Sequence, residues 1–498
     1  MRIELSLAFL LISLSGCAGY AYVKPSVTVP VAYKEGSDAL SPTTPPPGWA
    51  AAVPRDAQDR GAWWEVFGYP QLNDLEARVS VSNQSIQKAV ATLRQARAAV
   101  GVARASYFPT ITSGITQDRF HTSKNVIGRQ QLAGNTVSDY GVGVDASWEP
   151  DLFDKVGHEV DAATARAQAS EADLASVQLS MHAELAIDYF DLHDSDAETK
   201  LLQKTVAAYR DALDLVRHRF DAGAASDFDV AQAQTQLETT QSQLIDLNVA
   251  HAELEHAIAT LIDEPASNFS LSTDGSQLAP PAVPTGIPSQ LLERRPDVAA
   301  AERRVAASAA DVGQATSAFF PDLVLSASGG LESSNLAGWL SMPSRFWAIG
   351  PALIGTVFDG GRRRQGLESA KASYAASVAD YRQIAVSAFQ EVEDNLAAGE
   401  TLATEARTQD SAVRSSQRAL EVALNRYRAG AVSYLDVIVA QSTALANERT
   451  AIEIAHRRAD ASALLIKALG GVWTSPIERR ASLERLSINS KTRNEHEP

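Results

Sequence analysis

The chain has 498 residues, enough for two or three ordinary domains, and 45% of them are apolar, enough for a sizeable core. Its formal net charge of −16 argues against nucleic acid as a partner, because nucleic-acid binding requires basic patches. No apolar run of about 18 residues follows the N-terminal segment, so we expect no transmembrane helix in the mature chain.

The first residues have the pattern of an export signal. A basic residue, Arg2, precedes the apolar run 5–14, which is too short to span a bilayer, and small residues follow. We therefore assign 1–16 to a removed signal peptide. Its last letters together with the next residue, "LSGC", resemble a bacterial lipobox, which implies cleavage before Cys17 and attachment of fatty acyl chains to that residue.

The segment after the signal is expected to be an acylated tether, residues 17–69. Cys17 is the only cysteine, so the chain can form no internal disulfide although it is exported. Ala18 follows it in place of the aspartate that favours retention in the inner membrane, which points to the outer membrane. Residues 24–54 are rich in Pro, Ser and Thr, as is typical of an extended arm.

Long stretches without helix breakers dominate the rest of the chain. Gly and Pro are absent from 158–222 and from 224–264, where most residues are good helix formers. The later stretches 367–429, interrupted only by Gly399, and 431–469 have the same character. The first stretch alone would be about 98 Å long at about 1.5 Å per residue. The sequence therefore predicts helical rods rather than a compact helical domain.

Two turns between these rods have nearly the same sequence. The segment "RFDAGAASDFDVAQAQ" (219–234) aligns without a gap with "RYRAGAVSYLDVIVAQ" (426–441), 426 − 219 = 207 residues later. Gly223 and Gly430 can end a helix with positive φ, and each turn is expected to be the tip of a helical hairpin. The candidate caps of the two return helices are Ser226, Asp227 and Ser433.

The first return helix has a near-heptad apolar seam, typical of coiled-coil packing. Its members are Leu237, Leu244, Leu247, Leu254, Ile258 and Leu261. His251 occupies one position of this seam, and we interpret it as a partly buried packing residue rather than a ligand. The histidines of "HAELEH" are five residues apart, so they do not share a helical face as a metal site would require.

Strand-like segments lie between the rods. Residues 139–148 alternate strictly between apolar and polar side chains, the pattern of a membrane β-barrel strand. Further strands are expected at 110–120, 322–331 and 346–358, the last with poor alternation. Four strands cannot close a barrel, because bacterial barrels begin at about 8 strands, so the chain is expected to oligomerise.

The whole pattern occurs twice. Besides the turns, "GVARASYFPTI" (101–111) is echoed by "GQATSAFFPDL" (313–323), where a helix stops at the proline and a strand region follows. We place a first repeat at 70–280, a second at 281–475, and a C-terminal tail at 476–498.

These residues resemble the outer-membrane efflux proteins, the TolC-like exit ducts of tripartite pumps, and within them the lipoprotein branch. The likeness covers nearly all of 60–475. It rests on "LSGC", on "SYFP" and "AFFP" before the strand pairs, on "RRPDVAAAERRVAAS" (294–308) and on "YRAGAVSYLDV" at the second tip.

The resemblance implies an α+β membrane protein that acts as the exit duct. In a homotrimer, each chain would add four strands to one transmembrane β-barrel and its coiled-coil hairpins to a periplasmic α-helical barrel, in contact with outer-membrane lipid. Its implied partners are a periplasmic adaptor (membrane fusion) protein and an inner-membrane transporter, most closely the resistance-nodulation-division type. The adaptor-contacting tip residues would be Gly223, Ala224, Ser226, Gly430, Ala431 and Ser433, and the periplasmic gate would include Asp229, Tyr427 and Asp436.

Other functions fit the sequence less well. No HExxH, P-loop or GxSxG pattern occurs, so we expect no enzyme, no cofactor and no metal site. A non-pore acylated coiled coil that tethers or scaffolds the envelope would have the same helices but would not need the strand pairs. The exit duct of a type I protein secretion system remains open within the same family. Asp229 and Asp436 could also simply favour the first turns of the return helices.

Overall fold

The computed structural model describes residues 22–27, 29–30, 33–35, 61–125, 134–273, 275, 281 and 294–471. The expected signal peptide 1–16, the lipidation residue Cys17 and the tail 476–498 lie outside these residues. The chain divides into two compact units, each made of segments distant in sequence. The first consists of Met1–Ser26, Thr92–Ser170 and Ala300–Tyr381, and the second of Val27–Ala91, Glu171–Ala299 and Arg382–Pro498.

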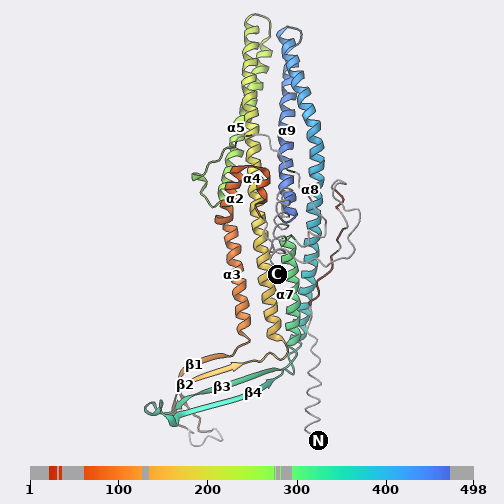
Figure 1. Cartoon of the computed structure of the whole chain (residues 1–498). Helices are drawn as coiled ribbons and strands as arrows, with labels where there is room; N and C mark the ends of the chain where they lie inside the picture. The colour runs from red at the N-terminus through yellow and green to blue at the C-terminus, as the bar shows by residue number, and fades with distance from the viewer. Residues whose placement is uncertain are drawn as a thin grey trace, which may run out of the picture. The chain divides into compact units, whose positions relative to one another are not determined.

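The first unit contains a four-stranded antiparallel sheet (Figure 1) with strand order β1-β2-β3-β4. Its strands are β1 (Thr110–His121), β2 (Thr136–Trp148), β3 (Asp322–Ser333) and β4 (Arg345–Ile354). All four expected strands are confirmed, but β4 ends four residues before the expected limit of 358. Two short 3-10 helices, η4 (Leu336–Gly338) and η5 (Met342–Ser344), connect β3 to β4.

A helix leads into each strand pair, and each stops just before the expected proline. They are α3 (Gln84–Ala105) and α7 (Pro296–Ser317). Where β2 leads back into a helix, the side chain of Asp151 accepts a hydrogen bond from Gly157 N–H at 2.7 Å. Asp154, which directly precedes α4, adopts a left-handed backbone conformation with φ 59°. At the equivalent place after β4, Asp359 accepts from Gly361 N–H and Arg363 N–H.

The long helices repeat with an exact offset. Helices α4 (Lys155–Asp221) and α8 (Arg362–Arg428) have 67 residues each, and α5 (Asp227–Leu261) and α9 (Tyr434–Ala468) have 35 each. Every one of these boundaries is displaced by 207 residues between the two halves, as in 362 − 155 and 434 − 227. The predicted helical runs and the twofold repeat are therefore confirmed.

The second unit is held together by a core around α4. The 3-10 helix η2 (Trp63–Phe67) and α2 (Pro70–Ser82) bury their apolar side chains against α4, α5 and α9. Its fully buried members include Leu72, Phe190, Ile258 and Ile466. The predicted seam of α5 is buried or half-buried throughout, and a short 3-10 helix, η3 (Ala266–Asn268), follows it.

Candidate functional site

Both hairpin tips, which belong to the second unit, are built by the same hydrogen bonds. In the first, Gly223 N–H donates to Phe220 O at 2.8 Å and Ala224 N–H to Arg219 O at 2.7 Å. In the second, Gly430 N–H donates to Tyr427 O and Ala431 N–H to Arg426 O, both at 2.9 Å. Gly223 and Gly430 each have φ 73°, a backbone conformation that residues other than glycine rarely adopt.

The return helices begin with a capping box in each tip. Ser226 N–H donates to the carboxylate of Asp229 at 2.9 Å, and Asp229 N–H donates back to Ser226 Oγ at 3.2 Å. Ser433 and Asp436 form the same pair. The hydrogen bonds from Ser433 lower the pKa of Asp436 below its usual range. The expected roles of Ser226, Ser433 and the two aspartates in starting these helices are confirmed, whereas Asp227 is the first helical residue rather than the cap.

The six predicted tip residues are exposed, and two apolar side chains beside them are exposed as well. Phe228 and Leu435 occupy equivalent positions, 435 − 228 = 207, and are 67% and 53% exposed. Next to the second tip lies a groove of about 450 Å³. Its lining is Ser415, Arg418, Ala419, Val422, Ala423, Arg426, Val432 and Asp436. The tips thus present apolar and charged side chains to solvent. The sequence analysis, which located the tips by their glycines, did not identify these side chains.

Tyr427 is buried between the two tips, but it does not bond Asp229. The guanidinium of Arg219 lies 4.6 Å from the centre of its ring, and Arg219 Nη1 donates to Tyr427 O at 2.5 Å. The Tyr427 hydroxyl is buried and has no hydrogen-bond partner among the described residues. Burial, with the charge of Asp229 nearby, raises the pKa of Tyr427. Arg219 therefore joins the two hairpins within one chain, a role that sequence comparison of the tips did not reveal.

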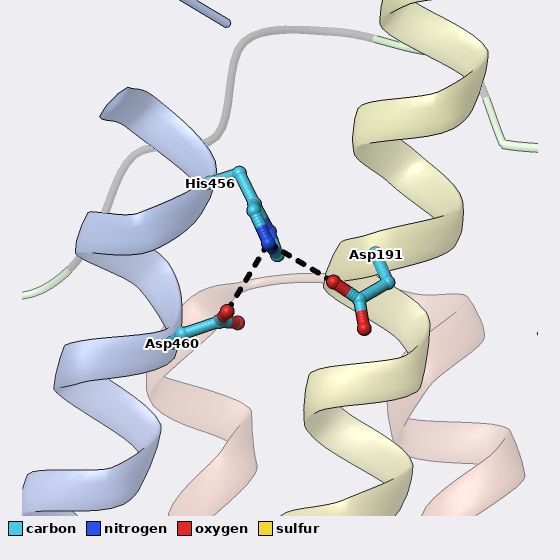
Figure 2. A group of neighbouring side chains, drawn as sticks. All are labelled: Asp191, His456 and Asp460. Atoms are coloured by element: carbon cyan, nitrogen blue, oxygen red, sulfur yellow. Dashed lines mark ion pairs between the residues drawn. The ribbon is translucent and has the colours of Figure 1, made fainter. Parts of the chain in front are cut away.

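A second polar group lies farther along the helices of the same unit. His456 on α9 points between Asp191 on α4 and Asp460, one turn from it on α9 (Figure 2). Its Nε2 atom is 2.9 Å from a carboxylate oxygen of Asp191 and 3.2 Å from one of Asp460. Burial opposes the charge of His456, but the hydrogen bond to Asp191 and the neighbouring aspartates raise its pKa. Burial also raises the pKa of Asp460 to about 7.

The family of the chain follows from comparison with known proteins. The family model for outer membrane efflux proteins matches residues 77–263 and 287–471, one match per repeat. The chain therefore belongs to this family, whose members are outer-membrane channel components of efflux pumps, not known enzymes. No helix among the described residues is both long enough and apolar enough to cross a membrane.

Three relatives illustrate the range of the similarity. The pyoverdine export outer membrane protein OpmQ of Pseudomonas aeruginosa is 31% identical over 431 residues, 86% of this chain and 90% of that protein. The probable outer membrane lipoprotein SilC of Salmonella typhimurium is 27% identical over 468 residues, 92% of this chain and 96% of that protein. The structure of the outer-membrane channel OprN superposes with a TM-score of 0.80 at 28% identity, covering 90% of this chain and 99% of that one.

Proposed function

We propose that this efflux protein works as a homotrimeric exit duct, anchored by acylated Cys17, whose tips receive a periplasmic adaptor coupled to a transporter of the resistance-nodulation-division type. The observation that carries the proposal is that most large apolar side chains of the sheet lie on one face and all of its acidic side chains on the other. This division matches the requirements of a strand layer with lipid on one side and water on the other.

Strand register supports this division. Residues directly opposite each other in antiparallel strands lie on the same face of the sheet. Across the four strands, Ile111 is paired with Ala146, Ala146 with Ala327, and Ala327 with Ile349. The same face also carries Ile115, Val142, Val144, Trp148, Leu323, Leu325, Leu331, Trp347 and Leu353. The large apolar side chains of the edge strands on this face, including Ile115 and Trp347, are exposed within one chain, at 75% and 76%.

The other face carries all the acidic side chains of the sheet, together with a few apolar residues such as Phe120 and Val137. It carries Asp145 opposite Thr112 and Ser328, and Glu332 opposite Gly141. Asp118 and Asp139 lie directly opposite each other, an arrangement that repels unless water or cations reach the carboxylates. Such a face suits the inside of an aqueous pore and would favour cations.

The sheet edges supply the argument for a trimer. In the four-strand order, β1 and β4 each have a strand neighbour on one side only. An open edge of this length has to pair with another chain or be covered, and open strands are not tolerated in lipid. Pairing β1 of one chain with β4 of the next would close a barrel from three copies.

The tips and the relatives support an efflux duct over the two alternatives. Exposed Phe228 and Leu435 next to the six predicted tip residues give an adaptor apolar anchor points at equivalent places in both repeats. A coiled-coil tether would not need the sheet. Among the relatives, OpmQ is named for pyoverdine export and TtgF of Pseudomonas putida for toluene efflux, which favours small-molecule efflux over protein secretion. Asp229, Tyr427 and Asp436 are proposed to line the gate that closes the periplasmic end.

Disulfide trapping tests the barrel directly. Thr112→Cys on β1 is combined in turn with a cysteine at alternate residues of β4 from Phe346 to Ile354, all on the same face of the sheet as Thr112. At least one combination is expected to yield covalent trimers on oxidation, because paired strands bring Cα atoms within disulfide reach. The matched control, Ser147→Cys with Ser326→Cys, joins facing residues of β2 and β3 and is expected to give monomers.

Conductance completes the test. The same purified trimer, reconstituted in planar bilayers, is expected to pass cations in preference to anions. Absence of covalent trimers from every edge combination, with the internal control cross-linked and no conductance measured, would overturn the duct in favour of the tether.

A further inference from the structure

We propose that Asp191, His456 and Asp460 form a binding site for a divalent first-row transition-metal ion, with Zn²⁺ as the representative, that joins α4 to α9. The site lies within one chain and so does not depend on the proposed pore. It consists of one imidazole and two carboxylates, a donor set that suits Zn²⁺ and related ions.

The spacing of the donor atoms fits a single ion. Two ligand atoms each about 2.1 Å from one ion lie about 3.0 Å apart at right angles and about 3.4 Å apart in a tetrahedron. Here the Nε2 atom of His456 is 2.9 Å from Asp191 Oδ1 and 3.2 Å from Asp460 Oδ2. All three donors lie within 4.8 Å of one another. A single ion placed between the three donors would therefore require only small side-chain movements.

Both carboxylates meet the same ring nitrogen, and this convergence is what distinguishes the group from an ordinary ion pair. The histidine of the α5 seam provides the comparison within the same unit. His251 has one carboxylate at each ring nitrogen, with Asp196 2.9 Å from Nδ1 and Glu255 3.6 Å from Nε2. Two groups on opposite sides of a ring cannot share one ion with it.

The carboxylates near the two histidines also differ in the hydrogen-bond donors that they receive. Asp196 Oδ2 accepts from both Thr273 N–H and Thr273 Oγ1–H at 2.8 Å, and Glu255 accepts from Leu271 N–H at 2.6 Å. Near His456, by contrast, Asp460 Oδ1 and Asp194 Oδ1 are buried and have no hydrogen-bond donor among the described residues.

No described lysine or arginine forms an ion pair with the carboxylates around His456. Arg449 pairs instead with Glu198, one turn beyond Asp194 on α4. Buried carboxylate oxygens without donors are costly, and a divalent cation would compensate them. Asp194, one turn from Asp191 on α4, is placed to act as the outer carboxylate, and a water would complete the coordination.

Zinc titration of the chelator-stripped, full-length protein in detergent tests the site. Isothermal titration calorimetry is expected to give one saturable Zn²⁺ per chain for the parent. His456→Gln and Asp460→Asn are expected to weaken binding by at least the about 10–100-fold that loss of an outer-shell partner typically causes. His251→Gln, the matched control, is expected to bind like the parent.

A spectroscopic measurement distinguishes a coordinated metal ion from a cation that acidic surface residues attract non-specifically. Co²⁺ in the parent is expected to give the visible absorption of a protein-ligated ion, displaced by Zn²⁺ and lost in His456→Gln. The near-isosteric Asp460→Asn keeps the test valid if His456→Gln fails to assemble. The proposal would be overturned if His456→Gln and Asp460→Asn bound Zn²⁺ as tightly as the parent. It would also be overturned if His251→Gln lost as much Zn²⁺ affinity as these two variants.

Discussion

The buried pair Glu76–His182 gives the sharpest test of how the second unit is stabilised. Glu76 lies on α2 with no exposed surface, and its carboxyl is 2.5 Å from Nδ1 of His182 on α4. Burial raises the pKa of Glu76 well above its usual range and lowers the pKa of His182 to about 4. The other Glu76 oxygen has no partner among the described residues, which a buried charge would not tolerate. We infer a neutral carboxylic acid that donates to a neutral imidazole.

Glu76→Gln separates this neutral pair from a buried ion pair. A glutamine amide can donate to His182 in place of the acid, so we expect the free energy of unfolding at pH 7 to change by no more than about 1 kcal/mol, the size of one neutral hydrogen bond. A buried ion pair that lost one charge would instead lose about 3–5 kcal/mol. Denaturant unfolding of the purified protein in detergent, monitored by circular dichroism, distinguishes these two magnitudes.

The pH dependence of stability carries the second half of the test. Between pH 6.5 and about 4 the unfolded chain binds a proton at His182 that the folded chain does not, so stability falls as the pH is lowered through this window. A shift of that size corresponds to about 3 kcal/mol per chain. Glu76 acts in the opposite sense: its raised pKa makes stability fall as pH rises through the folded value. Between pH 4.5 and 6.5 the two slopes oppose each other, so the pair contributes little net pH dependence there in the parent. Glu76→Gln removes the Glu76 contribution and is therefore expected to expose the loss of stability at acid pH that His182 causes.

His182→Gln and an exposed histidine on the same helix provide the controls. In the Glu76→Gln background, a second change His182→Gln is expected to flatten the acid limb, whereas His218→Gln, at an exposed position of α4, is expected to leave it unchanged. A loss of about 3 kcal/mol or more at pH 7 in Glu76→Gln, or an acid limb that His182→Gln leaves unchanged in that background, would refute the neutral-pair reasoning.

Two further predictions concern the proposed duct. Cys17→Ala is expected to abolish incorporation of radioactive fatty acid into the protein, and unchanged labelling would exclude Cys17 as the acylation site. Tyr427→Phe combined with Asp229→Ala is expected to raise single-channel conductance and to make cells leak large antibiotics without loss of trimer, because the Tyr427 hydroxyl finds no partner within the described part of its own chain. Asp227→Ala, which removes a neighbouring exposed carboxylate, is the control. If the double variant and the parent have equal conductance, the gate assignment is wrong and the aspartates serve only to start the return helices.

The local features of the fold could be predicted from sequence because short-range rules determine them. Gly223 and Gly430 end helices through their own backbone conformation, and Ser226 and Ser433 cap the next helices through residues three positions away. Strict alternation located β2, since its period of two differs from that of a helix. The weakest strand signal, 346–358, had the largest error in a boundary, because its face assignment comes from pairing with β3.

The contacts between helices could not be predicted in the same way. Asp191 and His456 are 456 − 191 = 265 residues apart, and neither belongs to a motif. Glu76 and His182 are separated by 106 residues. Arg219 was visible in the aligned tips, but its contact with the Tyr427 ring depends on how the two hairpins pack. Such pairs depend on the rotation of each helix about its axis, which a sequence of alanine-rich rods specifies poorly.

The repeat makes the cluster at His456 stand out from the rest of the helical architecture. With the offset of 207, the residue equivalent to Asp191 is Ala398 and the residue equivalent to His456 is Val249. The residue equivalent to Asp460 is Glu253, so this position is acidic in both repeats, whereas Asp191 and His456 are replaced by small or apolar residues. Packing of the hairpins therefore does not require an aspartate and a histidine at these two positions, since the equivalent α8–α5 positions do without them. The contact between Asp191 and His456 is an addition to one of two otherwise matching helix pairs, which is the distribution expected of a ligand site and not of a structural element copied with the repeat.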